Sequence, residues 1–362
     1  MDSLTQAAMG AVVGERALGR QLGRRGLAWG ALFGTLPDLD ILAYPFLDPI
    51  AELYWHRGFS HSVFGILLLS PLFAWLLFRW WKRRSIAITY RRALLFVLLN
   101  FGTHVLIDCF TMYGTQLAEP FSNRRFGLNN LFIIDLLFTA PLLVWIAAAL
   151  FRRKKPGVAS HSMVALCSVF LLSYTTFSFV AQSKADDRFR EELVKMGIDP
   201  DRGRVTAVPF NTLIWRGLYE TEDRYWISYW AVTDNSEPLY FVDVPRQVDL
   251  LEPFRGDRAI DCVLWFSEEF LLVEPQADRR TFLATDLRFV EFWTEDAGGL
   301  PRTFFAWKVA PAEKGNPSVF EPFQPRRPDV ADLFRSMRDR LKGDRRALLP
   351  PSAVPSRPLD GR

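Results

Sequence analysis

Cysteine and histidine are scarce in this sequence, which has three cysteines and four histidines in 362 residues. The cysteines, Cys109, Cys167 and Cys262, are far apart and form no Cys-x-x-Cys pattern, so neither a disulfide framework nor a cysteine zinc site is predicted. A strong charge of one sign is also lacking, since the formal net charge is +4. The basic residues gather at the ends of apolar runs rather than along one helix face, so we expect no nucleic-acid partner.

Long apolar segments are abundant in the first half of the chain. Four of them, at about residues 62–81, 93–112, 131–151 and 159–181, are long enough to cross a hydrocarbon layer, which takes about 20 helical residues. Two shorter segments, residues 4–19 and 26–36, precede them and carry glycines at four-residue spacing, a pattern that lets helix backbones approach closely. The sequence therefore predicts a tight N-terminal helical hairpin followed by four transmembrane helices.

The basic residues are distributed unevenly around these segments. Between the first two segments lie Arg79, Lys82, Arg83, Arg84, Arg91 and Arg92. Residues 152–155 form a second basic group, whereas the opposite ends have only Arg57, Arg124 and Arg125. The positive-inside rule then makes the loops at 82–92 and 152–158 cytoplasmic. We expect a multi-pass protein of the bacterial inner membrane, with residues 56–61 and the whole C-terminal region in the periplasm.

The composition changes after residue 182. Aromatic and β-branched runs such as "RYWISYWAV" and "LYFVDV" alternate with Asp-Asn, Pro and Gly signals, which is typical of antiparallel β-structure. The predicted fold class is an α-helical membrane bundle followed by a β-rich soluble domain. The predicted boundaries are 1–181 for the helical membrane domain, 182–345 for the β-rich extracytoplasmic domain and 346–362 for a disordered tail.

Ionisable side chains gather at one predicted level of the membrane, the outer one. The candidate metal ligands come from four segments and are Asp38, Asp40, His56, His61, His104, Asp108 and Asp135. His104 and Asp108 are four residues apart and so share a helix face. Imidazole and carboxylate groups are ordinary ligands of Zn²⁺, and Mn²⁺ also suits carboxylates. The sequence predicts a site for one to three such ions, because polar groups at this depth are costly and usually functional.

The histidines at positions 56 and 61 need a local explanation. On a continuous helix, five residues turn a side chain by about 140° net, so these two rings would point to different faces. We expect His56 in a loop that folds back, with Ser60 capping a helix whose first turn carries His61. The predicted catalytic residues are Asp38 or Asp40 as general base and Arg57, which would hold a phosphate group.

Each of these features also has a purely structural interpretation. The Asp-x-Asp pair after Pro37 is common in turns and helix caps, and His104 with Asp108 is a plausible hydrogen-bonded pair inside a helix bundle. Asp135 also suits a pairing role within the bundle. All seven groups would then share one depth by coincidence, which favours the metal site. A proton-relaying transporter is a further alternative, weakened by the confinement of the polar groups to one end of the predicted spans.

Four motifs in order carry a family resemblance: "MDSLTQAAMGAVVGE", "GTLPDLD", "HRGFSHS" and "THVLIDCFTMYGTQLAEPFS". Over roughly residues 1–180 they resemble the bacterial inner-membrane metal-dependent hydrolases, a family also labelled LexA-binding or LexA-regulated inner-membrane protein. That family is distantly similar to the zinc-dependent phospholipase C and S1–P1 nuclease group. The resemblance implies that Asp38, Asp40, His56, His61, His104 and Asp108 are metal residues, with Asp135 nearby. One departure is Gln6, where many members have His.

The leading hypothesis is therefore a membrane-bound metal-dependent hydrolase of phosphoesters or phospholipid-like substrates. It would act on a membrane lipid or amphiphile at the outer face of the inner membrane. The alternative is a non-catalytic, membrane-anchored assembly or stress-response protein with a structural metal, whose C-terminal domain binds a periplasmic protein. Seven candidate ligands exceed the four of a closed structural site, which favours catalysis.

Overall fold

The computed structural model describes residues 1–152, 159–278, 280–293, 298–313, 316–326 and 329–356. It divides into two compact units, of which the first comprises Met1–Leu47, Tyr54–Ser178 and Pro209–Asn211. The helical elements that build the first unit are α1 (Ser3–Leu22), α2 (Arg24–Thr35), η1 (Pro37–Phe46), α3 (Pro49–Trp55), η2 (Phe59–His61), α4 (Val63–Arg83), α5 (Tyr90–Asp108), α6 (Leu136–Phe151) and α7 (His161–Lys195). Helix α3 begins, and α7 ends, in the second unit.

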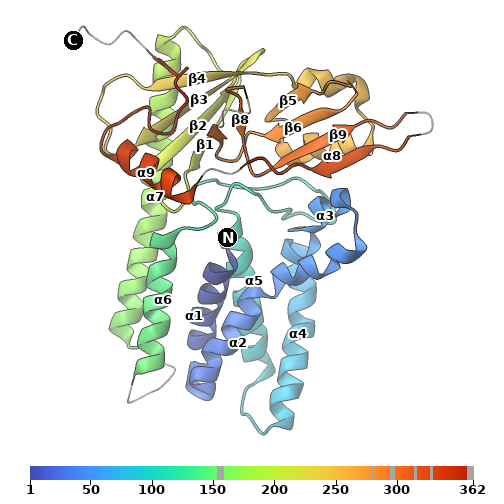
Figure 1. Cartoon of the computed structure of the whole chain (residues 1–362). Coiled ribbons are helices and arrows are strands. Elements are labelled where there is room, and N and C mark those ends of the chain that lie inside the picture. Colours follow the sequence, from blue (N-terminus) through green and yellow to red (C-terminus); the bar gives the residue numbers. More distant parts are fainter. Residues whose placement is uncertain (153–158, 279, 294–297, 314–315, 327–328, 357–362) are drawn as a thin grey trace. The chain divides into compact units, whose positions relative to one another are not determined.

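Helices α1 and α2 form the predicted hairpin, turning at Gly23 with a φ of 55° (Figure 1). Their glycines meet without side chains between the backbones. A Cβ placed on Gly14 would overlap the carbonyl oxygen of Gly26 and lie 2.6 Å from Gly30 Cα. A Cβ on Gly10 would lie 2.6 Å from Gly34 Cα. The four-residue glycine spacing thus works as predicted, by allowing direct backbone contact.

The close packing of the hairpin predicts a strong effect for a single methyl group. In Gly14→Ala the new Cβ has to push α1 and α2 apart, so we expect a loss of about 1–3 kcal/mol of stability, seen as a lower melting temperature in detergent. The matched control is Gly102→Ala in α5, where a Cβ would meet nothing within 4 Å. That variant should gain up to about 1 kcal/mol from helix propensity. Equal melting temperatures for the two variants would contradict the packing argument.

Fewer helices qualify as membrane spans than the four predicted. Within the described residues, two are long and apolar enough to cross a bilayer, α4 with 21 residues and α7 with 35. Helix α5 does not qualify, because Arg91 and Arg92 open it and His104 and Asp108 are buried near its end. Helix α6 has only 16 residues, about 24 Å at 1.5 Å per residue. The prediction of four spans is therefore wrong as stated, and its two middle segments are an apolar helix interrupted by buried polar residues and a short apolar helix.

The second unit contains Asp48–Leu53, Phe179–Val208 and the chain from Thr212 onward. It holds a five-stranded antiparallel sheet in the order β1-β2-β3-β4-β11 and a four-stranded antiparallel sheet in the order β10-β9-β6-β5. The strands and remaining helices are β1 (Arg202–Ala207), β2 (Ile214–Glu220), β3 (Arg224–Ala231), β4 (Tyr240–Pro245), η3 (Val248–Phe254), α8 (Arg258–Ser267), β5 (Leu271–Pro275), β6 (Phe282–Asp286), β7 (Phe292–Trp293), β8 (Pro301–Arg302), β9 (Ala306–Ala310), β10 (Val319–Pro322), α9 (Val330–Leu341) and β11 (Val354–Pro355). The β-rich C-terminal domain is thus confirmed.

Two of the predicted segment boundaries differ from those in the structure. Helix α7 continues to Lys195, beyond residue 181, because Ala185, Phe189 and Leu193 bury their side chains in a core with Trp215 and other residues of the five-stranded sheet. The predicted disordered tail from residue 346 is ordered as far as residue 356, because β11 pairs with β4. Residues 357–362 of that tail, and residues 153–158 of the predicted cytoplasmic loop, lie outside the described residues.

Candidate metal centre

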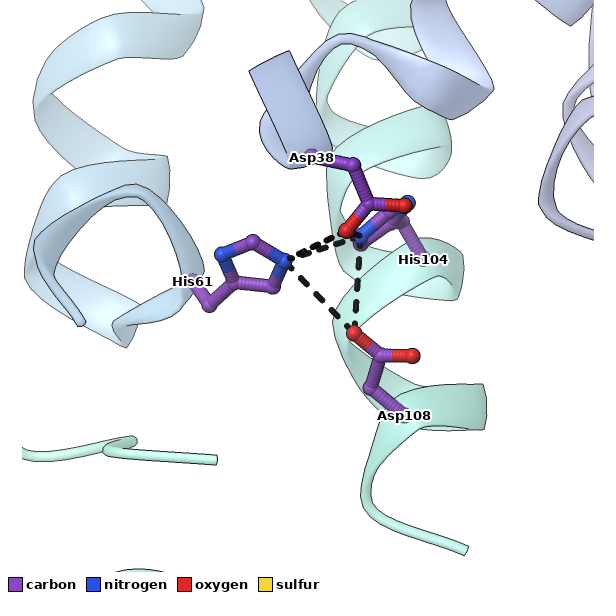
Figure 2. Close-up of side chains that lie close together, drawn as sticks. All are labelled: Asp38, His61, His104 and Asp108. Atoms are coloured by element: carbon purple, nitrogen blue, oxygen red, sulfur yellow. Dashed lines mark hydrogen bonds and ion pairs between the residues drawn. The ribbon is translucent and has the colours of Figure 1, made fainter. Parts of the chain in front are cut away.

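Four of the predicted ligands converge in the first unit (Figure 2). Asp38 comes from η1, His61 from η2, and His104 and Asp108 from neighbouring turns of α5. The two imidazole Nε2 atoms are 3.0 Å apart. Asp38 Oδ1 lies 3.3 Å from His61 Nε2 and 3.4 Å from His104 Nε2. Asp108 Oδ2 lies 3.5 Å from each of the two nitrogens.

Local structure explains how these side chains reach one point. Pro37 starts η1 directly after the hairpin and places Asp38 in the first turn of that 3-10 helix. His56 lies in the turn after α3, as predicted. Ser62, rather than the predicted Ser60, caps α4, accepting a hydrogen bond from the Gly65 backbone N–H at 2.8 Å. His61 is consequently the last residue of η2, just outside the membrane helix.

Hydrogen bonds fix the orientation and tautomer of both rings. His104 Nδ1 lies 2.6 Å from the carbonyl oxygen of Gly34, which only accepts, so this nitrogen carries the proton. His61 Nδ1 lies 2.9 Å from Ser60 Oγ, and that hydroxyl donates to Asp40 Oδ2 at 3.3 Å. His61 Nδ1 therefore donates as well. Both Nε2 lone pairs then face the centre of the cluster.

The donor set fits one divalent cation. Ligand atoms about 2.0–2.1 Å from a tetrahedral Zn²⁺ lie about 3.3–3.4 Å from one another. Five of the six donor pairs are 3.0–3.5 Å apart, and all four donor atoms lie within 4.8 Å of one another. Asp108 Oδ2 is buried and has no hydrogen-bond partner, although buried carboxylates are normally satisfied. A cation would satisfy this oxygen and remove the repulsion between the converging lone pairs. This is the single cluster of such geometry among the described residues.

The electrostatic environment keeps these ligands in the protonation state that a cation needs. Burial raises the pKa of the Asp38 carboxyl, but a proton on the facing His104 or His61 ring would hold this pKa well below its usual range, so Asp38 stays ionised whenever either ring is charged. Burial lowers the pKa of His61, which favours the neutral imidazole. Metal binding requires this combination of neutral imidazole and ionised carboxylate.

Asp40 and His56 lie behind the cluster rather than in it. Asp40 Oδ2 is 3.6 Å from His61 Nδ1 and accepts from the backbone N–H of Arg57 at 3.1 Å. Its other oxygen is 3.1 Å from His56 Nδ1. Burial raises the pKa of Asp40, but His56 and the neighbouring groups outweigh this effect and lower it. Asp40 thus supports His61 from the back, in the arrangement that orients metal-bound histidines in many proteins.

Asp40 also provides a prediction about metal affinity. The Asp40→Asn protein should hold its cation about 10–100-fold more weakly, because His61 loses the carboxylate that orients it. Competition with a chromophoric chelator measures this change. Asp48→Asn is the control, since Asp48 caps α3 and pairs with Arg258 in the second unit. If both variants had the wild-type affinity, Asp40 would have no role in supporting the site.

Arg57 and Gln6 hold the outer oxygen of Asp108. Arg57 is 3% exposed, and its guanidinium lies 3.1 Å from Asp108 Oδ1 and donates to Thr111 Oγ1 at 3.2 Å. Gln6 donates its amide to the same Asp108 oxygen at 2.9 Å. The amino group of Met1 contacts this oxygen too. Sequence reasoning identified Gln6 only as a departure from a family pattern and did not identify Thr111, for which the sequence holds no signal.

Asp135 is not in the cluster. It caps α6, accepting from the Phe138 backbone N–H at 3.0 Å. It also accepts hydrogen bonds of 2.8 and 2.9 Å from the Tyr174 hydroxyl of α7. This geometry matches the pairing role within the bundle. Of the seven candidate ligands, the structure brings together Asp38, His61, His104 and Asp108.

Comparisons with known proteins agree with a membrane assignment. Uncharacterized protein YfhP of Bacillus subtilis (strain 168) is 26% identical over 211 residues, which are 55% of this chain and 62% of that protein. Inner membrane protein YbcI of Escherichia coli (strain K12) is 30% identical over 125 residues, which are 34% of this chain and 69% of that protein. No solved structure matches the chain.

The family described as YdjM inner membrane protein matches residues 1–184, just over half of the chain. The matched region includes the glycine hairpin and all four residues of the cluster. The chain therefore belongs to the YdjM inner membrane protein family.

Proposed function

We propose that this chain is a metal-dependent hydrolase that cleaves a phosphoester of a membrane lipid or similar amphiphile at the periplasmic face of the inner membrane. The convergence of four donor atoms around the unsatisfied oxygen of Asp108 is the observation that carries the proposal. The position of the cluster in the chain supports a substrate at headgroup depth. His61 lies two residues before α4, and α4 is long enough to span a bilayer. The basic residues Lys82 and Arg83 at the other end of α4 support the periplasmic side through the positive-inside rule.

Asp38, His61, His104 and Asp108 would hold a divalent cation, which would supply Lewis acidity toward a phosphoryl oxygen and a water molecule. The water oxygen would attack phosphorus while the bond between phosphorus and the ester oxygen breaks, and the proton taken from the water would pass to the departing oxygen, which leaves as the alcohol. Asp38 accepts the proton from the water, because its side chain is 20% exposed whereas the other three ligand side chains are fully buried. In the proposed reaction Arg57 positions the ligand Asp108, because its guanidinium faces that carboxylate.

Turnover of bis-p-nitrophenyl phosphate tests this function. Wild-type protein in detergent, supplied with Zn²⁺ or Mn²⁺, should release p-nitrophenol, and the His61→Ala protein should show only background. His161→Ala is the matched control, because His161 is exposed at the start of α7. The proposal fails if wild type and His61→Ala release p-nitrophenol at the same rate.

A structural metal remains a second candidate function, favoured by one observation. The cluster has four protein donors, the number found in closed structural zinc sites, and three of these side chains are fully buried. In that case the protein would be a membrane-anchored assembly or stress-response protein, and the β-rich domain would bind a periplasmic partner. Asp38→Ala separates the two functions. With excess Zn²⁺ or Mn²⁺ supplied to restore the cation, a catalytic site should still lose turnover in Asp38→Ala. A structural site should show no turnover even in the wild type, and Asp38→Ala should then only lower the melting temperature.

A further inference from the structure

An apolar cavity of about 380 Å³ adjoins the candidate metal centre. Its apolar lining includes Leu39 of η1, Trp55 of α3, Phe59 of η2, Leu69 and Phe73 of α4, and Phe101 of α5. Its polar lining residues are Asp40 and Ser60, the two residues that contact His61 on its Nδ1 side. The cavity is thus hydrophobic along its walls and polar at the end next to His61, and none of the four cluster residues is part of its lining. Binding sites for small amphiphiles have this character, with a mostly apolar lining and few polar groups.

On α4 the cavity is lined by Leu69 and Phe73. Phe73 lies ten residues after the start of that helix at Val63. Ten helical residues rise about 15 Å, which is half of a hydrocarbon layer about 30 Å thick. Phe73 also lines a second apolar cavity of about 630 Å³ between α2 and α4, with Trp29 and Trp80 in its walls. The two cavities therefore share Phe73 as a wall residue.

The entrance of the cavity is accessible from an apolar surface. Leu39, Trp55 and Phe59 are 43%, 50% and 38% exposed. Leu68 and Leu72 of α4 are more than half exposed as well, as expected for a helix that contacts lipid. A chain leaving the bilayer would therefore not have to cross a polar barrier.

We propose that this cavity holds one hydrocarbon chain of the substrate, while the phosphoester of the same molecule lies at the Asp38–His61–His104–Asp108 cluster. This inference rests on the proposed function and specifies its substrate class as a phosphoester with a long alkyl or acyl chain. Each methylene group buried in the cavity contributes to binding, so longer chains are preferred until the cavity is full.

The test compares two substrates that differ only in chain length, butyl and hexadecyl p-nitrophenyl phosphate, both presented in micelles of the same detergent. Wild type should turn over the hexadecyl ester faster. Leu69→Trp fills the cavity, and should lower the ratio of hexadecyl to butyl turnover about tenfold, equivalent to roughly 1.4 kcal/mol. Leu72→Trp is the matched control, since Leu72 lies on the same helix, is 51% exposed and is absent from the lining of either cavity. Equal turnover of the two esters by wild type, or an equal loss of both in Leu69→Trp, overturns the proposal.

A binding measurement keeps this inference separate from the hydrolase proposal. A hexadecyl phosphate with a photoreactive diazirine at its chain end should label the α4 peptide of wild type, and Leu69→Trp should abolish the labelling. If neither ester is turned over but this labelling occurs, the hydrolase function fails and the chain site stands. If wild-type α4 is not labelled, the chain site is refuted whether or not the esters are hydrolysed.

Discussion

Replacing His104 with alanine is expected to leave the purified protein without its divalent cation. His104 supplies one of the four donor atoms, its Nε2 lies 3.0 Å from that of His61, and its proton is held on the other nitrogen by Gly34. Alanine leaves no side chain to fill this position, and the three remaining donors would have to bind the ion from one side. We expect metal content to fall from about one ion per chain to less than a tenth of that.

Elemental analysis of detergent-purified protein measures this change without knowledge of the substrate. His161→Ala is the control and should retain the wild-type content, because His161 lies at the exposed start of α7. Wild-type protein that contained no stoichiometric Zn²⁺ or Mn²⁺ after purification without chelators would refute the metal centre. So would a His104→Ala protein with unchanged content.

The second large effect concerns Asp108, which connects the cluster to Arg57. In Asp108→Ala the cation loses a ligand, and the buried guanidinium of Arg57 loses the carboxylate that lies 3.1 Å away. Removing one partner of a buried ion pair typically costs about 3–5 kcal/mol of stability, because the other charge stays buried without a partner. We therefore expect loss of the cation together with a large fall in melting temperature.

Asp135→Asn is the comparison for this variant. It alters another buried carboxylate of the same unit, the one that caps α6 and accepts from Tyr174, but leaves the four donors in place. Its melting temperature should fall while its metal content stays at the wild-type value. If Asp135→Asn lost the cation as well, metal loss would be a general consequence of destabilisation, and the assignment of Asp108 as a ligand would lose its support.

The sequence was informative about which segments contribute to the site and less so about which side chains do. His104 and Asp108 could be paired because helix geometry puts positions four apart on one face. The Asp38–Asp40 pair could not be resolved in this way. Both lie on the 3-10 helix η1, where successive residues turn by about 120°, so two positions separate the side chains by about 240°. Only Asp38 faces the cluster, and Asp40 contacts His61 from the other side.

The sequence likewise predicted some of the membrane helices correctly and others wrongly. The apolar pattern identified α4 and the first part of α7, where hydrophobic residues predominate, and the glycine spacing identified the hairpin. It overestimated α5, because a long apolar run does not reveal whether its few polar residues face lipid or a protein interior. In the structure Asn100, His104 and Asp108 are all buried against other helices. The pairing of β11 with β4 depends on contacts more than a hundred residues apart, which local composition does not encode.

The hydrogen bond between His104 and Gly34 has a consequence for mutational studies of this family. The group that sets the His104 tautomer is a main-chain carbonyl, so a scan that truncates side chains one by one leaves it intact and would not detect it. Its position depends on how closely two helices approach, since a Cβ on Gly34 would lie 2.7 Å from Gly10 Cα. Substitutions at Gly10 or Gly34 should therefore weaken ion affinity from a distance, although neither residue has an atom that could coordinate through its side chain.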